Sequence, residues 1–119
     1  MSESLSRQQL LDIAREFGTP VYVYHLEKIK EQYDKLISAF SALDTRFFYA
    51  CKALTNINIL KYINSLGGGI DCSSVNEVKL AVHAGIPKEQ ILYTSNGVSL
   101  EEIDEVLGKV QEVFPRQRV

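Results

Sequence analysis

Apolar residues in the first forty positions recur every three or four residues, which is the spacing of an amphipathic helix. The first expected helix lies within residues 5–18 and ends at Gly18, since glycine is a frequent helix stop. A second helix is expected over residues 26–40. Between the two, the Val- and Tyr-rich segment 19–25 predicts a short strand with Pro20 at its start, where a missing N–H costs little.

Beyond residue 45 the pattern changes to short apolar runs that alternate with helical periodicity. The expected strands span 46–52, 69–72 and 90–94, and the expected helices span 56–66, 74–84 and 100–107. Equivalent strand positions at Phe48, Ile70 and Ile91 are 22 and 21 residues apart. A strand, loop, helix and turn repeated at this period is typical of a parallel sheet, and so the sequence predicts an α/β fold.

The repeat alone does not decide between an open sheet and a barrel. A complete (β/α)8 barrel needs about 200 residues or more, whereas this chain has 119. If the parent architecture is a barrel, the chain is expected to be a piece of one. The glycine run 67–69 precedes a strand instead of following one, and we therefore expect a helix-to-strand turn there and not a phosphate-binding loop.

Composition excludes several classes of protein. The chain is 45% hydrophobic and 24% charged, which is typical of a globular domain, and a net charge of -2 gives no electrostatic footprint for nucleic acid or an anionic membrane. No apolar run is long enough to span a bilayer, and no secretory signal is expected. Cys51 and Cys72 lack metal-type spacing, which favours reduced thiols in a cytoplasmic protein and no metal site.

The candidate chemistry lies where the expected strands end. Reactive groups of parallel α/β folds lie at the carboxyl ends of strands and in the loops that follow. Three expected strand ends are polar here: Lys52 ends the first strand, Asp71 lies near the end of the second before Ser73 and Ser74, and Thr94 ends the third before Ser95 and Asn96. If both side chains lie at the same edge of the sheet, burial there would lower the pKa of the lysine amine and make it more nucleophilic, as Schiff-base chemistry requires. A nearby carboxylate would have the opposite effect, because it favours the charged form of the amine. The alternative is structural: Lys52 extends into solvent and pairs with Asp71.

Three motifs carry a resemblance to a known family. The segments "FGTPVYVYHLEKI", "FFYACKALTN" and "GGGIDCSSVNEVKLAVHAGIP" resemble those of the fold-type III, alanine racemase-like pyridoxal-phosphate (PLP) decarboxylases. The 19-residue step from Lys52 to Asp71 and the six-residue step on to Glu77 match that family's pattern. The likeness extends over about residues 17–107.

The resemblance implies a fold, a cofactor and roles for three residues. It implies that residues 1–119 are the N-terminal part of a PLP-binding domain, a partial (β/α)8 TIM barrel of about three βα units preceded by a helix and a strand. Lys52 would hold the cofactor covalently, Asp71 would lie near its amine and would also contact the cofactor, and Glu77 would lie on the imine side of the cofactor. PLP would accept the electrons released when a substrate carboxylate departs.

Substrate and partners remain open at this stage. The likeness is greatest to members that decarboxylate diaminopimelate, with ornithine, arginine and carboxynorspermidine as alternatives. The family's phosphate loop, its ring-stacking histidine and its C-terminal β-domain are expected further along than this chain reaches. We therefore expect a homodimer of a full-length parent, self-association of this chain, and, as a second possibility, a catalytically silent βα module.

Overall fold

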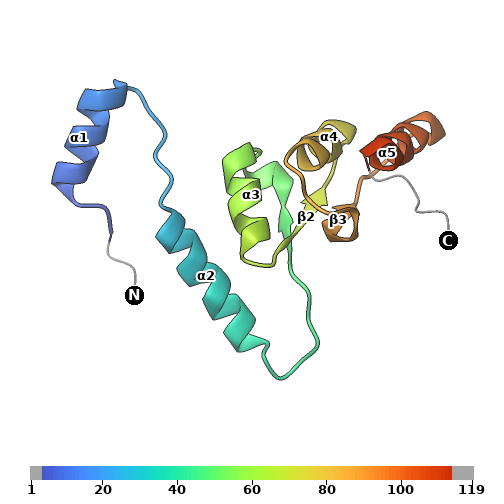
Figure 1. The fold of residues 1–119 in the computed structure, drawn as a ribbon, viewed down its shortest axis with the longest axis horizontal. Coiled ribbons are helices and arrows are strands. Elements are labelled where there is room, and N and C mark those ends of the chain that lie inside the picture. The colour runs from blue at the N-terminus through green and yellow to red at the C-terminus, as the bar shows by residue number, and fades with distance from the viewer. Residues whose placement is uncertain (1–3, 114–119) are drawn as a thin grey trace. The chain divides into compact units, whose positions relative to one another are not determined.

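The computed structural model describes residues 4–113 (Figure 1). The chain divides after Asp44 into two compact units, each described by itself below. The first unit contains two helices, and the second contains a three-stranded parallel sheet with its helices. This confirms an α/β fold with a small parallel sheet. None of the described helices is both long and apolar enough to cross a membrane.

The first unit consists of helices α1 (Arg7–Phe17) and α2 (Leu26–Ala39). A reciprocal capping box starts α1, because Ser6 accepts a hydrogen bond from the Gln9 N–H while the Gln9 side chain accepts one from the Ser6 N–H. Gly18 ends the helix at φ 80°, a left-handed conformation that glycine adopts without strain. Both helices were expected within two residues of these bounds.

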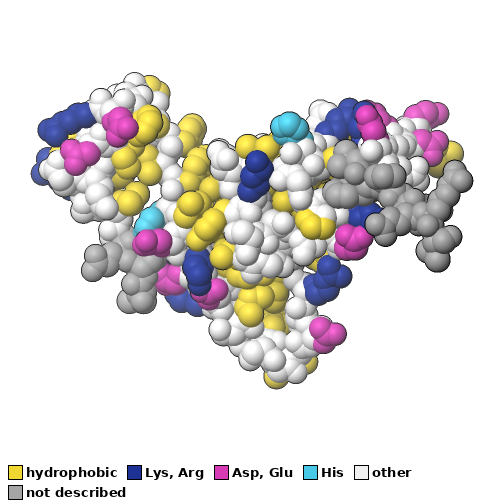
Figure 2. Space-filling view, in the orientation of Figure 1, with side chains coloured by type: hydrophobic (Ala, Val, Ile, Leu, Met, Phe, Trp, Pro, Cys, Tyr) yellow, Lys and Arg dark blue, Asp and Glu magenta, His cyan; other side chains and the backbone are white. Residues whose placement is uncertain are grey.

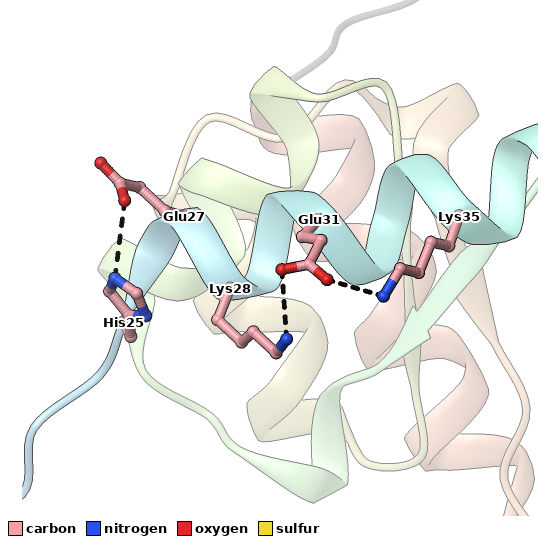
Figure 3. Close-up of polar contacts among 5 residues, drawn as sticks. All are labelled: His25, Glu27, Lys28, Glu31 and Lys35. Atoms are coloured by element: carbon pink, nitrogen blue, oxygen red, sulfur yellow. Dashed lines mark hydrogen bonds and ion pairs between the residues drawn. The ribbon is translucent and has the colours of Figure 1, made fainter. Parts of the chain in front are cut away.

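A chain of charged contacts runs along α2 (Figure 3). The Glu31 carboxylate lies between two lysines, with Lys28 Nζ at 3.1 Å and Lys35 Nζ at 2.6 Å. At the N-terminus of the helix, His25 Nε2 lies 3.6 Å from Glu27. The two lysine pairs of Glu31 are three and four residues apart along the helix, and each such pair stabilises a helix by a few tenths of a kcal/mol.

The prediction of a strand over residues 19–25 is wrong. No part of this segment pairs with a strand, and it forms an irregular connection between α1 and α2. Its Val and Tyr residues alternate as in a strand, but a strand exists only where a ladder satisfies its backbone groups. The described sheet contains β1, β2 and β3 alone, all of them beyond residue 44, and Tyr22 of the segment is 89% exposed.

The second unit repeats strand and helix as expected. Its elements are β1 (Phe48–Ala50), the 3-10 helix η1 (Cys51–Ala53), α3 (Ile57–Ser65), β2 (Gly69–Cys72), α4 (Val75–His83), the 3-10 helix η2 (Lys88–Gln90), β3 (Ile91–Tyr93) and α5 (Leu100–Val113). Asn56, Ser74 and Ser99 accept backbone hydrogen bonds at the starts of α3, α4 and α5. Glu102 completes a capping box at the start of α5, because its carboxylate accepts a hydrogen bond from the Ser99 N–H at 3.0 Å.

Two boundaries in this unit differ from the expectation. The first strand stops at Ala50, and Lys52 lies in η1, where the Leu54 N–H donates back to the Cys51 carbonyl at 3.1 Å. Helix α5 continues past residue 107 to Val113. Gly108 therefore lies inside this helix and does not end it, although glycine is a poor helix former.

The strands lie parallel in the order β1-β2-β3, with Ala50 beside Asp71 and Asp71 beside Leu92. Because side chains alternate between faces, Ile70 and Cys72 share one face of β2 while Asp71 lies on the other. Both apolar residues are fully buried, and α3 and α4 pack against β2. The core of this unit therefore lies on the helix-covered face.

The opposite face of the sheet is only partly covered. Phe48 shields Gly69, since a Cβ added at Gly69 would lie 2.5 Å from a carbon of the Phe48 ring and 3.0 Å from the Gln90 carbonyl oxygen. The preceding Gly67 adopts φ 101° in the expected helix-to-strand turn. Farther along this face, Leu92 is 43% exposed. Apolar side chains also reach the surface elsewhere in both units (Figure 2).

We predict that Tyr93→Phe stabilises the second unit. The Tyr93 hydroxyl is buried and has no hydrogen-bond partner among the described residues, and an unsatisfied buried hydroxyl costs about 1 kcal/mol or more. Urea unfolding followed by circular dichroism should show a gain of about 1 kcal/mol. Tyr49→Phe is the matched control, because its hydroxyl donates to the Leu54 carbonyl at 3.4 Å. An equal loss of stability in both variants would contradict the prediction.

Candidate active site

The carboxyl ends of all three strands meet at one edge of the sheet, because the strands are parallel. Helix η1 follows β1, the segment Ser73–Ser74 follows β2, and the segment Thr94–Asn96 follows β3. These are the polar segments that the sequence placed at strand ends. The edge therefore gathers candidate residues that are far apart in the sequence.

Lys52 reaches this edge from η1, which contacts β2. Its neighbour Cys51 is fully buried, whereas Lys52 is exposed. Among the described residues, Lys52 makes no hydrogen bond and no ion pair. The apolar shielding that the sequence led us to expect around the amine is absent from the described part of the chain, but the amine is accessible and unengaged.

Asp71 lies half-buried on the open face of β2, between Ala50 and Leu92. Its carboxylate accepts a hydrogen bond from the Thr94 hydroxyl. Within the described residues it does not pair with Lys52, so the ion pair of the structural alternative is absent there, whereas the exposure of Lys52 that the same alternative expected is found.

Glu77 lies in the first turn of α4 and holds the turn that precedes the helix. Its carboxylate accepts hydrogen bonds from the Ser73 N–H at 2.6 Å and from the Ser73 hydroxyl at 3.1 Å. The Glu77 N–H in turn donates to the Ser74 hydroxyl at 3.3 Å. These hydrogen bonds fix the turn at the end of β2. The negative charge of Glu77 near the N-terminus of α4 also stabilises the helix, through its favourable interaction with the helix dipole.

Two thiols lie beneath this polar edge. Burial raises the pKa of the Cys72 thiol to about 12, with further contributions from Cys51, Glu77 and Asp71. Burial and the negative charge of Glu77 also raise the pKa of the Cys51 thiol. Both thiols therefore stay protonated at neutral pH and are poor nucleophiles. No cluster of three metal-ligating side chains exists among the described residues.

Sequence reasoning brought Lys52 and Asp71 to one edge but missed the hydrogen-bond partners of the two carboxylates, Asp71 and Glu77. Thr94 was recognised as a polar strand end and Ser73 as part of the loop after β2, yet neither was assigned a contact. A signal for Thr94 exists in the strand register. Asp71 is beside Leu92, and Thr94 lies two residues farther along the same face.

Comparison with known proteins gives a consistent result. Residues 26–114 match the family described as pyridoxal-dependent decarboxylase, pyridoxal binding domain. The chain is 41% identical over 99 residues to a diaminopimelate decarboxylase from Methanothermobacter thermautotrophicus, covering 82% of this chain and 23% of that protein. It is 38% identical over 95 residues to one from Campylobacter jejuni, covering 80% of this chain and 24% of that protein.

A solved structure agrees with these relatives. Diaminopimelate decarboxylase from Helicobacter pylori, complexed with L-lysine, superposes with a TM-score of 0.76 at 32% identity over 85% of this chain and 26% of that one. The chain thus spans about a quarter of the length of the relatives that it matches. On the match of residues 26–114, the chain belongs to the pyridoxal-dependent decarboxylases and represents part of their pyridoxal-binding domain.

Proposed function

We propose that this chain serves a PLP-dependent decarboxylase that converts meso-2,6-diaminopimelate to L-lysine and CO2. One observation carries the proposal: the chain is 41% and 38% identical to two diaminopimelate decarboxylases over about four fifths of its length. The chain spans about a quarter of those proteins, and the activity is therefore proposed for a complete enzyme of which this segment forms the lysine-bearing part.

The residues at the sheet edge fit an aldehyde cofactor. The Lys52 amine is exposed and has no partner among the residues that the structure describes, so it is available for covalent attachment. The neighbouring thiols of Cys51 and Cys72 are buried and have raised pKa values, so they do not compete for the aldehyde. When bound, PLP supplies the electron sink that makes loss of a carboxylate feasible.

Each of the three candidate residues has a proposed task. Lys52 would hold the cofactor through its amine, and its Nζ is also the atom that would hold or move a proton in this site. Asp71, fixed on the open face of the sheet, presents a carboxylate near that amine and that cofactor. Glu77 belongs to the same site and orients the turn after β2 through Ser73, as its hydrogen bonds support.

We further infer that the small sheet is part of a (β/α)8 barrel and that both compact units belong to one domain. The parallel order β1-β2-β3 with helices on one face supports the barrel, because a barrel of this type has its helices outside. The family match supports the single domain. It begins at residue 26, in the first unit, and continues through the second.

The proposal predicts where PLP attaches. The chain is incubated with PLP, reduced with borohydride and digested, and the labelled peptide is identified by mass spectrometry. Label is expected at Lys52 with a stoichiometry near one and should disappear in Lys52→Arg. In the matched control Lys61→Arg, which changes an exposed lysine of α3, label at Lys52 should persist. Label spread evenly over all lysines would contradict the assignment.

Substrate choice is tested on a complete enzyme that contains this segment. Release of CO2 from diaminopimelate, ornithine, arginine and carboxynorspermidine is measured side by side. Diaminopimelate is expected to have the highest kcat/KM. A preference for any of the other three would refute the proposed substrate while leaving the cofactor assignment intact. No release of CO2 from any of them would refute the proposed decarboxylase activity.

We also propose that the complete enzyme is a homodimer and that the isolated chain self-associates. The outer strands β1 and β3 each have one neighbour within the described sheet, and Leu92 lies exposed on the open face. Light scattering at tens of micromolar should give a mass above that of the monomer. Leu92→Lys should lower the measured mass. Leu100→Lys, which changes an exposed leucine at the start of α5, is the control and should leave the mass unchanged. A monomer at these concentrations would count against self-association.

A further inference from the structure

We infer that Thr94 is a positioning residue, whose hydroxyl holds the Asp71 carboxylate and thereby keeps the Lys52 amine out of a permanent ion pair. Lys52 and Asp71 come from η1 and β2, which are in contact, and they carry opposite charges. Opposite charges on neighbouring elements attract, so a salt bridge between these two side chains is the competing arrangement. In this structure the carboxylate accepts a hydrogen bond from Thr94 instead, and Lys52 has no partner among the described residues.

The backbone places Thr94 for this contact. Its N–H donates to the Cys72 carbonyl at 2.9 Å, which extends the β2–β3 hydrogen bonds by one step beyond the end of β3. Since Leu92 is the register partner of Asp71, Thr94 follows on the same face and next to the carboxylate. The branched Cβ of threonine also restricts χ1, so little conformational freedom is lost when the hydroxyl binds.

Few other groups compete for Asp71. Its register neighbours Ala50 and Leu92 are apolar, and among the described residues Thr94 is the one hydrogen-bond donor to its side chain. The other carboxylate at this edge, Glu77, is engaged by Ser73. Other titratable groups near this edge in the described part of the chain include the buried thiols of Cys51 and Cys72 and the Tyr49 hydroxyl, which donates to the Leu54 carbonyl. Removing the Thr94 hydroxyl therefore leaves Lys52 as a candidate partner for Asp71.

The consequence is a change in amine reactivity. An amine reacts in its neutral form, and an ion pair holds it in the charged form. A partly exposed ion pair is weak, and so its formation should shift the reactivity profile of Lys52 to higher pH by about 0.5 unit. At a fixed pH on the rising part of the profile, this corresponds to about threefold slower reaction.

The experiment measures acetylation of each lysine by acetic anhydride as a function of pH, with mass-spectrometric readout. Thr94→Val removes the hydroxyl at nearly constant shape and should slow acetylation of Lys52 about threefold, while Lys61 on α3 stays unchanged. Thr94→Ser keeps a hydroxyl and should restore the original profile. In the Asp71→Asn background, Thr94→Val should have no effect on Lys52.

A second variant keeps the inference testable if Thr94→Val fails to fold. Asp71→Asn alone should shift the Lys52 profile by less than about 0.5 pH unit, because a carboxylate that Thr94 holds acts on the amine only through a screened charge and not through an ion pair. A larger shift of that profile to lower pH would mean that the ion pair exists in the original protein and would overturn the inference. An unchanged profile in folded Thr94→Val, or a serine variant that behaves like valine, would overturn it too.

The outcome does not depend on the proposed function. Acetic anhydride reports on the amine itself, and so the Thr94 result stands whether or not PLP labels Lys52. Failure of PLP labelling together with the expected acetylation profiles would refute the cofactor assignment alone. Labelling at Lys52 without any effect of Thr94→Val would refute the role of Thr94 alone.

Discussion

The parallel register of β1, β2 and β3 is the constraint on which the candidate site depends. It sets Ala50, Asp71 and Leu92 side by side on one face and buries Ile70 and Cys72 on the other. A slip of one residue would exchange the faces and bury the Asp71 carboxylate under the helices, at a cost of several kcal/mol. Because the helix-covered face must bury apolar side chains, the register is fixed, and this places Asp71 on the open face.

Much of the fold could be predicted from sequence, because its local signals are self-contained. The caps at Ser6, Asn56 and Ser74 mark helix starts through hydrogen bonds within three residues, and the structure places the helices there. The strand expected at 19–25 failed for the opposite reason. Its alternating Val and Tyr residues describe a surface suited to a sheet, but the partner strand is a property of the whole fold. The position of Lys52 was also mispredicted, because the strand ends at Ala50 and Lys52 lies in a 3-10 turn. That turn depends on a single backbone hydrogen bond, from the Leu54 N–H to the Cys51 carbonyl, and the sequence carries no strong signal for it.

The candidate site was predictable to the level of its edge and no further. Charge and strand position bring Lys52 and Asp71 together, and opposite charges then suggest an ion pair. Whether they pair depends on which donor lies nearest to the carboxylate. The register decides this in favour of Thr94, through a contact that spans 23 residues of sequence. The spacing of residues within one strand cannot reveal such a contact. It becomes visible only when the register between β2 and β3 is known, because that register places Thr94 next to Asp71.

The same edge shows how a site can contain two carboxylates and a lysine without joining them in salt bridges. Each carboxylate has a hydroxyl donor close by, Thr94 for Asp71 and Ser73 for Glu77. Hydroxyl groups hold carboxylates without adding charge, so both acids are oriented while Lys52 remains unengaged among the described residues. An ion pair would orient one acid equally well, but it would also hold the amine in its charged form. For a lysine whose proposed task is attack on an aldehyde, the neutral donors are the better solution.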